Sequence, residues 1–183
     1  MKDFTHEDIH SVVRQKVFVQ NYKEKKMIDG VKTVEVKRYA GEDGTFEDIM
    51  RINNEGYLEF FPEFQVRQIN RSKLLAGVIK AWHLHYKQED IWYVPPDDHM
   101  ILGLWDTREV SPTRDLTMKI VMGNETSRLV FIPRGVAHGV VNVAGTAGNI
   151  YYFVNNQYKI EDPDEHRLPW DQLGKGFWEV EKG

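Results

Sequence analysis

Short apolar runs alternate with turn signals along most of the chain. The clearest runs cover residues 31–37, 77–86, 91–94, 100–105, 129–132, 140–143 and 150–154. They end where prolines, glycines or aspartates gather, as at Pro95-Pro96-Asp97-Asp98. Many short strands with closely spaced turns are typical of a β-sandwich or barrel rather than of alternating strands and helices. The pattern therefore predicts an all-β fold with little helix.

The N-terminal part of the chain breaks this pattern. Residues 1–27 are polar and charged, apart from an apolar patch at Val17-Phe18-Val19. A patch of this composition favours a strand, so the segment is either an arm that pairs with a partner subunit or a loosely docked extension. We predict an N-terminal arm over residues 1–27 and one domain over residues 28–183.

Two other segments are less regular. Residues 46–52 resume the strand pattern after a turn at residues 40–44, and the aromatic segment 57–64 suits either a strand or a helical turn. The C-terminal end is rich in Pro, Asp, Glu and Trp. Because its large aromatic residues need burial, we expect this end to wrap over the barrel; these residues are Trp170, Phe177 and Trp178.

Composition excludes several classes of protein. A length of 183 residues with 41% hydrophobic and 28% charged residues suits one globular domain. The net charge of −4 argues against a nucleic-acid partner, which usually needs a basic surface. The absence of cysteine rules out disulfides, thiolate metal sites and cysteine nucleophiles. No run approaches a membrane span, and the first thirty residues show no apolar signal region, so we expect a cytoplasmic protein without a membrane partner.

The histidines supply the first candidate chemistry. His83 and His85 lie two apart in a strand-like run, so they point to one side of that strand. Under strict alternation Ile79 and Ala81 lie on the same face as these histidines, and the opposite face carries Lys80, Trp82 and Leu84. Two imidazoles on one barrel face are costly to bury without partners. The remaining histidines lack such a context, and we expect surface or structural roles for them: His6, His10, His99 and His166.

Two spaced motifs connect these histidines to a known fold. Gly77-x5-His83-x-His85-x3-Glu89 resembles the first cupin motif, without its last glycine, and Pro133-x-Gly135-x2-His138-x3-Asn142 resembles the second. The implied fold is the cupin double-stranded β-helix, a jelly-roll barrel with a ligand site inside its mouth. Three imidazoles and one carboxylate would also suit a divalent transition metal, which gives an alternative ligand set: His83, His85, Glu89 and His138.

Five collinear blocks carry a closer resemblance. The chain resembles the dTDP-4-dehydrorhamnose 3,5-epimerase family, and especially its shorter epimerase-related branch, over about residues 28–178. The blocks are 68–72, 77–83, 106–113, 132–139 and 152–158, and the ending 162–169 also fits. These enzymes remove a proton from a carbon next to the C4 ketone of a nucleotide sugar and return it on the other face. The resemblance implies such a reaction, without a cofactor, in a homodimer.

The resemblance also implies roles for particular residues. His83 occupies the position of the catalytic base, for which an imidazole is suited by its pKa near neutrality. Tyr152 occupies the position of the opposing acid, and Lys80 replaces an arginine that lies beside the substrate. Gln68 and Asn70 match residues that hold the nucleotide, whereas His85 and His138 line the same cavity.

Several positions depart from the family pattern. The family has a turn whose arginine grips the substrate, and this chain has Glu42-Asp43-Gly44 there instead, without the arginine. Asp90 stands where the family has a lysine. The family's late aspartate, which pairs with the base, lies in a C-terminal tail that we expect this chain to lack, and Glu165, Asp171 or Glu179 are the candidate substitutes. Strict alternation also separates Lys80 from His83, so both reach one ligand only if their strand is bulged or twisted.

Three functions therefore remain open from the residues. The first is a metal-free epimerase or isomerase acting on a nucleotide-linked 4-keto sugar. The second is a metal-dependent cupin enzyme with the alternative ligand set. The third is a non-catalytic barrel that binds a sugar nucleotide, as the lost arginine, lysine and aspartate would favour.

Overall fold

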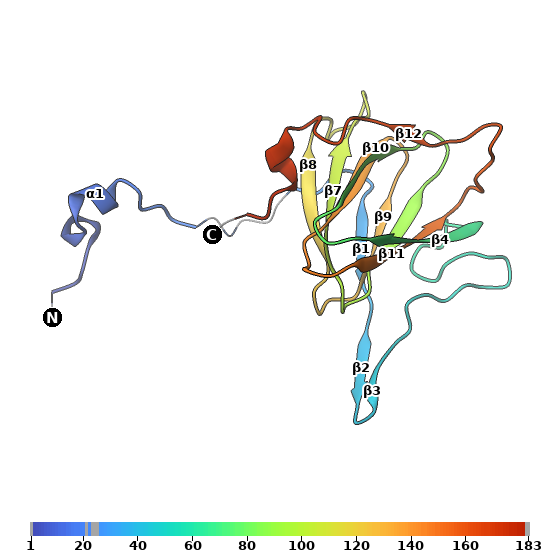
Figure 1. Cartoon of the computed structure of the whole chain (residues 1–183), viewed down its shortest axis with the longest axis horizontal. Coiled ribbons are helices and arrows are strands. Elements are labelled where there is room, and N and C mark those ends of the chain that lie inside the picture. Colours follow the sequence, from blue (N-terminus) through green and yellow to red (C-terminus); the bar gives the residue numbers. More distant parts are fainter. Residues whose placement is uncertain (1, 21, 23–25, 182–183) are drawn as a thin grey trace.

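The computed structural model describes residues 2–20, 22 and 26–181. Two five-stranded antiparallel sheets face each other, so the predicted all-β jelly roll is confirmed (Figure 1). One sheet has the order β1 (Lys32–Glu35), β9 (Arg128–Ile132), β6 (Asp90–Tyr93), β11 (Gly148–Val154) and β4 (Gln68–Leu74). The other has the order β12 (His166–Arg167), β5 (Ile79–Leu84), β10 (Val136–Asn142), β7 (His99–Asp106) and β8 (Thr117–Gly123).

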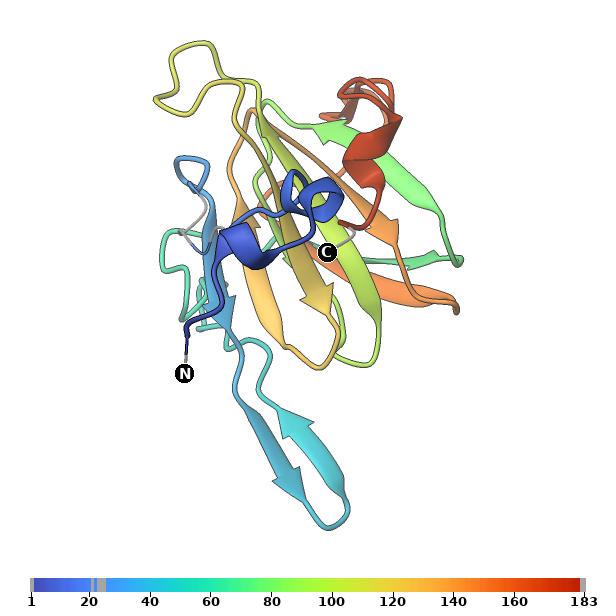
Figure 2. The same ribbon diagram turned by 90° about the vertical axis from the view of Figure 1, so that its left-hand side faces the viewer.

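The remaining elements lie outside these sheets. The hairpin of β2 (Arg38–Gly41) and β3 (Gly44–Glu47) projects from one end of the barrel (Figure 2). Helical structure in the described part of the chain is limited to η1 (His6–Asp8), α1 (Ser11–Arg14) and η2 (Lys175–Trp178). No helix there is long and apolar enough to cross a bilayer.

Three local expectations need correction. The strand expected over 46–52 ends at Glu47, and segment 57–64 forms bends and isolated bridges, neither strand nor helix. The apolar patch 17–19 forms no strand in the single chain and is exposed. Residues 1, 21 and 23–25 of the predicted arm, and residues 182–183 of the predicted domain, lie outside the described residues.

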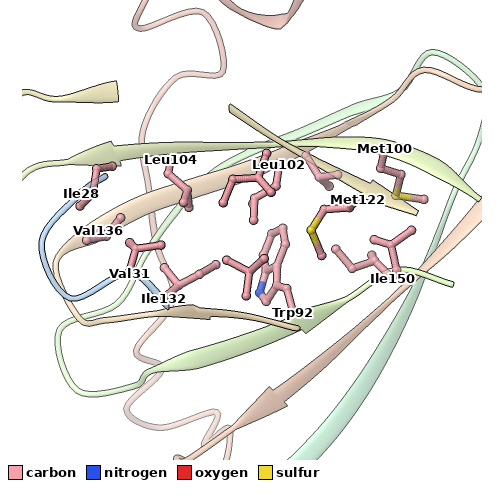
Figure 3. Packing of buried hydrophobic residues seen from close by; sticks show 14 of the residues in the cluster. Ile28, Val31, Trp92, Met100, Leu102, Leu104, Met122, Ile132, Val136 and Ile150 are labelled. Atoms are coloured by element: carbon pink, nitrogen blue, oxygen red, sulfur yellow. The ribbon is translucent and has the colours of Figure 1, made fainter. Parts of the chain in front are cut away.

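An apolar core fills the space between the sheets. Figure 3 shows the indole of Trp92 among the inward side chains of both sheets, which include Leu102, Leu104, Met122 and Ile132. These side chains are at most 2% exposed. Alternating inward residues from facing strands are what a closed barrel interior requires.

The C-terminal segment wraps over the outer face of the second sheet. Trp178 is 4% exposed and packs against Trp82, with ring centroids 4.8 Å apart. The close approach depends on Gly103, because a Cβ there would lie 2.7 Å from the rings of Phe177 and Trp178. The burial expected for Trp170 is wrong, since its side chain is 41% exposed and its backbone carbonyl accepts a hydrogen bond from the Trp178 indole.

Strand β5 contains a bulge that decides which residues face inward. His83 pairs with His138 but Lys80 pairs with Val140, so two residues of β5 stand opposite the single residue Gly139. A β-bulge inserts one residue and re-aims the side chains that follow it. The strict alternation predicted for this run is therefore wrong: Lys80, His83 and His85 face the cavity, whereas Ile79, Ala81, Trp82 and Leu84 pack under the C-terminal wrap.

Candidate active site

A polar cavity of about 220 Å³ opens between the two sheets on the side of β4 and β5. Strands β4, β5, β6, β10 and β11 and the segment before β12 supply its walls. The residues that line it include Asn70, Ser72, Lys80, His83, His85, Gln88, Asp90, Trp92, His138, Tyr152 and Glu165. The cavity thus collects most of the site residues predicted from the sequence.

His83 is held by a carboxylate from the C-terminal segment. Its Nδ1 lies 2.5 Å from Glu165 Oε1, and its Nε2 contacts the guanidinium of Arg167. Burial lowers the pKa of His83 below its ordinary value, although the hydrogen bond and charge of Glu165 act in the opposite direction. Burial raises the pKa of Glu165, but the hydrogen bond and charge of His83 outweigh it, so the pKa lies below its usual range. Of the three substitutes considered for the missing aspartate, the structure places Glu165 beside His83.

Lys80 and Tyr152 meet across the cavity from different sheets. The Lys80 ammonium donates a hydrogen bond to Ser72 Oγ at 2.9 Å and lies 5.6 Å from the centre of the Tyr152 ring. Burial lowers the pKa of Lys80, and the charge of Arg167 lowers it further. Burial raises the pKa of Tyr152 to about 12, so its phenol keeps its proton at neutral pH. Tyr152 is therefore able to act as an acid.

Two further imidazoles and a carboxyl group form the closed end of the cavity. His138 Nδ1 is 2.9 Å from the Val136 carbonyl, and His85 Nδ1 contacts the Asp164 carbonyl. Because each Nδ1 must donate to a carbonyl, each neutral ring presents a lone pair at Nε2. These two atoms lie 3.6 and 4.0 Å from Asp90 Oδ2. Burial lowers the pKa of His138 and raises that of Asp90, because burial disfavours the charged form of each group.

The alternative metal-ligand set is not assembled. Glu89 accepts a hydrogen bond from Asn155 Nδ2 at 2.9 Å and pairs with Arg134 at 3.6 Å, outside the cavity. Its neighbour Asp90 faces inward instead and accepts hydrogen bonds from Gln88 and the Trp92 indole. The sequence motif therefore selected the wrong carboxylate of the pair.

The residues predicted to hold the nucleotide lie on β4 at the open edge of the first sheet. Gln68 Nε2 donates to Asn70 Oδ1 at 2.8 Å, and Gln68 Oε1 accepts from the Tyr158 backbone at 3.0 Å. Ser72 continues the same two-residue period on this strand, a signal that would have identified it. Sequence reasoning missed Arg167, because the two-residue strand β12 leaves no periodic pattern to read.

The fold and this site together define a class of protein. A cupin jelly roll whose cavity holds a histidine paired with a carboxylate, a lysine and a tyrosine is equipped to move protons at carbon. The profile of the dTDP-4-dehydrorhamnose 3,5-epimerase family matches residues 25–176. The chain belongs to this family, as the resemblance implied, and is a carbohydrate epimerase.

Individual relatives agree with this assignment. The chain is 40% identical to the spore coat polysaccharide biosynthesis protein SpsL of Bacillus subtilis over 156 residues, which covers 85% of this chain and 99% of that protein. It is 28% identical to the probable low-salt glycan biosynthesis epimerase Agl13 of Haloferax volcanii, covering 79% and 89% of the two chains. A Legionella pneumophila epimerase structure in complex with dTDP-4-keto-L-rhamnose matches with a TM-score of 0.66 and 25% identity, covering 78% and 74%.

Proposed function

We propose that the chain epimerises a dTDP-linked 4-keto-6-deoxy sugar, with His83 as base and Tyr152 as acid. One observation carries the assignment of roles: His83 on β5 and Tyr152 on β11 face one cavity from opposite sheets, with Lys80 between them and Glu165 behind the base. A sugar ring held between the sheets would present one face to each group.

The proposed steps follow from these positions. His83 Nε2 takes the proton from the carbon next to the C4 ketone, while Glu165 holds the Nδ1 proton and stabilises the imidazolium. The electron pair of the broken C–H bond moves onto the C4 oxygen, and the Lys80 ammonium stabilises the enolate. The Tyr152 hydroxyl then delivers a proton to the same carbon from the other face, which inverts it.

Solvent isotope exchange tests this function. We expect the protein to incorporate deuterium from D₂O at the carbons next to the ketone of dTDP-4-keto-6-deoxyglucose, as measured by mass spectrometry and NMR. Tyr152→Phe should impair net inversion more than exchange, because proton removal by His83 survives. Tyr151→Phe is the matched control, since Tyr151 packs on the other face of β11 against Tyr93. An intact protein that binds the nucleotide sugar without exchange would support the non-catalytic alternative and overturn the proposal.

The proposed reaction needs no metal, because the base, the cation and the acid are all side chains. Elemental analysis of protein purified without chelators should find no stoichiometric transition metal. A stoichiometric metal that is lost in His138→Ala would favour the metal-dependent alternative instead.

The proposal extends to assembly and location. We expect each chain to consist of an N-terminal arm (1–27) and a barrel domain (28–183). We also expect a homodimer, because the projecting hairpin exposes two aromatic side chains, Tyr39 by 49% and Phe46 by 64%. Light scattering at micromolar concentration checks this, and a monomeric mass contradicts it. We also expect a cytoplasmic enzyme, which cell fractionation tests.

A further inference from the structure

Arg167 contacts Nε2 of His83, the ring nitrogen that has to accept the proton in the proposed reaction. It stands directly opposite His83 in the β12–β5 pairing, and its Nη1 contacts His83 Nε2. A guanidinium only donates hydrogen bonds, so the Nε2 lone pair is the acceptor in this contact. While that contact persists, Nε2 has no lone pair with which to take a proton from a carbon atom.

Two cations, Lys80 and Arg167, lie at the mouth of the cavity beside one carboxylate, Glu165. Arg167 and Lys80 are close enough that the charge of Arg167 lowers the pKa of both Lys80 and His83. Glu165 lies 3.6 Å from Arg167, but it is already paired with His83. The titratable or charged groups that face His83 from all surrounding elements are Lys80, His85, Asp90, His138, Tyr152, Glu165 and Arg167.

An anion at the mouth would relieve this repulsion. The Arg167 side chain is 49% exposed, so it is free to turn toward a ligand at the opening. Strand β12 borders β5 at the edge of one sheet, and β4 is the edge strand of the other. Lys80 links the two edges through Ser72. A diphosphate lying across this opening meets both cations, and arginine bonds phosphate oxygens through two parallel donors.

We propose that Arg167 binds the diphosphate of the substrate and, in doing so, leaves His83 Nε2, so that the base is released only when the substrate is bound. This inference rests on the function proposed above. No covalent bond changes: the N–H donor of Arg167 exchanges an imidazole nitrogen for phosphate oxygens, and the Nε2 lone pair becomes available.

The pH dependence of Arg167→Gln gives a test that a merely structural role would not satisfy. The acid limb of kcat/KM reports His83 in the free enzyme, whereas that of kcat reports it in the complex. Removing the guanidinium should raise the pKa of His83 in the free enzyme, because the charge of Arg167 lowers it. The acid limb of kcat/KM should therefore move to higher pH. The kcat limb should stay in place, because Arg167 has already left His83 in the complex, and KM should rise about tenfold or more. Parallel shifts of both limbs, or an unchanged profile and KM, would overturn the inference.

A matched variant controls for loss of one positive charge. Arg134 is 58% exposed, pairs with Glu89 outside the cavity, and precedes β10 on the same barrel. Arg134→Gln should leave both pH limbs and KM at wild-type values. Shifts in Arg134→Gln equal to those in Arg167→Gln would show a general charge effect and contradict a specific contact.

A binding experiment separates this inference from the proposed function. Wild-type protein with ¹⁵N-labelled histidine should show a shift of the His83 Nε2 resonance on addition of dTDP but not of thymidine, which lacks the diphosphate. Arg167→Gln should lose that shift and bind dTDP about tenfold more weakly, with thymidine affinity unchanged. Equal dTDP affinity in the two proteins overturns the role of Arg167. If these binding results hold but wild-type protein shows no deuterium exchange, the proposed function fails and diphosphate binding by Arg167 stands.

Discussion

The two sides of the barrel interior differ in nearly every physical property. Toward β1, β7, β8 and β9 the space is filled by apolar side chains such as Leu102, Leu104 and Met122, each with no exposed surface. Toward β4 and β5 the same space is a polar cavity with imidazole, ammonium and phenol groups. The first side stabilises the fold by burying apolar surface. The second contributes less to stability, because its buried polar groups need partners of their own.

Trp92 forms the boundary between the two sides. Its indole belongs to the apolar core, but it also packs edge to face against the rings of His138 and Tyr152. The ring centroids are 5.0 and 4.9 Å apart, respectively. Its Nε1 donates to Asp90 at 2.9 Å. One side chain thus gives the cavity a rigid apolar wall and one fixed polar contact.

The largest expected effect comes from a variant that changes only the polar side of the barrel interior. His83→Ala should reduce deuterium exchange by roughly 10²–10⁴-fold, because general base catalysis contributes that much. Its free energy of unfolding should change by no more than about 1 kcal/mol. Exchange assays and urea denaturation measure the two quantities. His10→Ala, in the exposed part of the arm, is the control, and wild-type exchange in His83→Ala would refute the assignment of the base.

The converse change weakens the apolar side alone. Leu102→Ala should lower the free energy of unfolding by about 2–5 kcal/mol, because it leaves a cavity in a fully buried position. Turnover per folded molecule should remain near wild type. Leu75→Ala, at a position 65% exposed, should have little effect on either. A proportional fall in turnover would show that the two sides are not independent.

A third variant disturbs both sides through the bulge. A Cβ on Gly139 would lie 2.3 Å from the Ala81 Cβ, so Gly139→Ala must displace β5. We expect a loss of about 1–3 kcal/mol in unfolding free energy, together with a lower kcat, since Lys80 and His83 move with the strand. Gly145→Ala meets no atom within 4 Å and serves as the control. Wild-type kcat in a destabilised Gly139→Ala would separate the bulge from the site.

The smallest effect concerns acid stability. The pKa values of His83 and His138 are lowered by burial in the folded chain, so below about pH 6.5 the unfolded chain binds more protons. The free energy of unfolding should therefore fall as the pH drops below that value, by up to about 1.4 kcal/mol per pH unit for each histidine. Denaturation at several pH values measures this slope, and His138→Gln should flatten it. An unchanged slope in that variant would contradict neutral burial of His138.

Sequence reasoning predicted the barrel from short strands and closely spaced turns, and it predicted most of the cavity residues through the family resemblance rather than from a period of two. His83, Lys80, Tyr152 and His138, which it grouped together, line one cavity, and its requirement for a bulge in the strand was met. It did not predict that Asp90 rather than Glu89 faces inward, since neighbouring strand residues point to opposite sides and the register decides which is buried. Arg167 escaped prediction because its position depends on pairing with β5, which lies 84 residues away in sequence.

Strand β12 also bears on how this barrel is able to change its chemistry over evolutionary time. It carries only His166 and Arg167, and beyond it Leu168 exchanges two backbone hydrogen bonds with Trp82, each 3.3 Å long. Glu165, the partner of the base, and Arg167 beside it thus both sit on a strap at the edge of the second sheet (residues 165–167), which contributes no side chain to the apolar core. Substitutions in the strap alter the reactivity of His83 without repacking the core. The catalytic character of such a protein is therefore free to diverge while its scaffold is preserved.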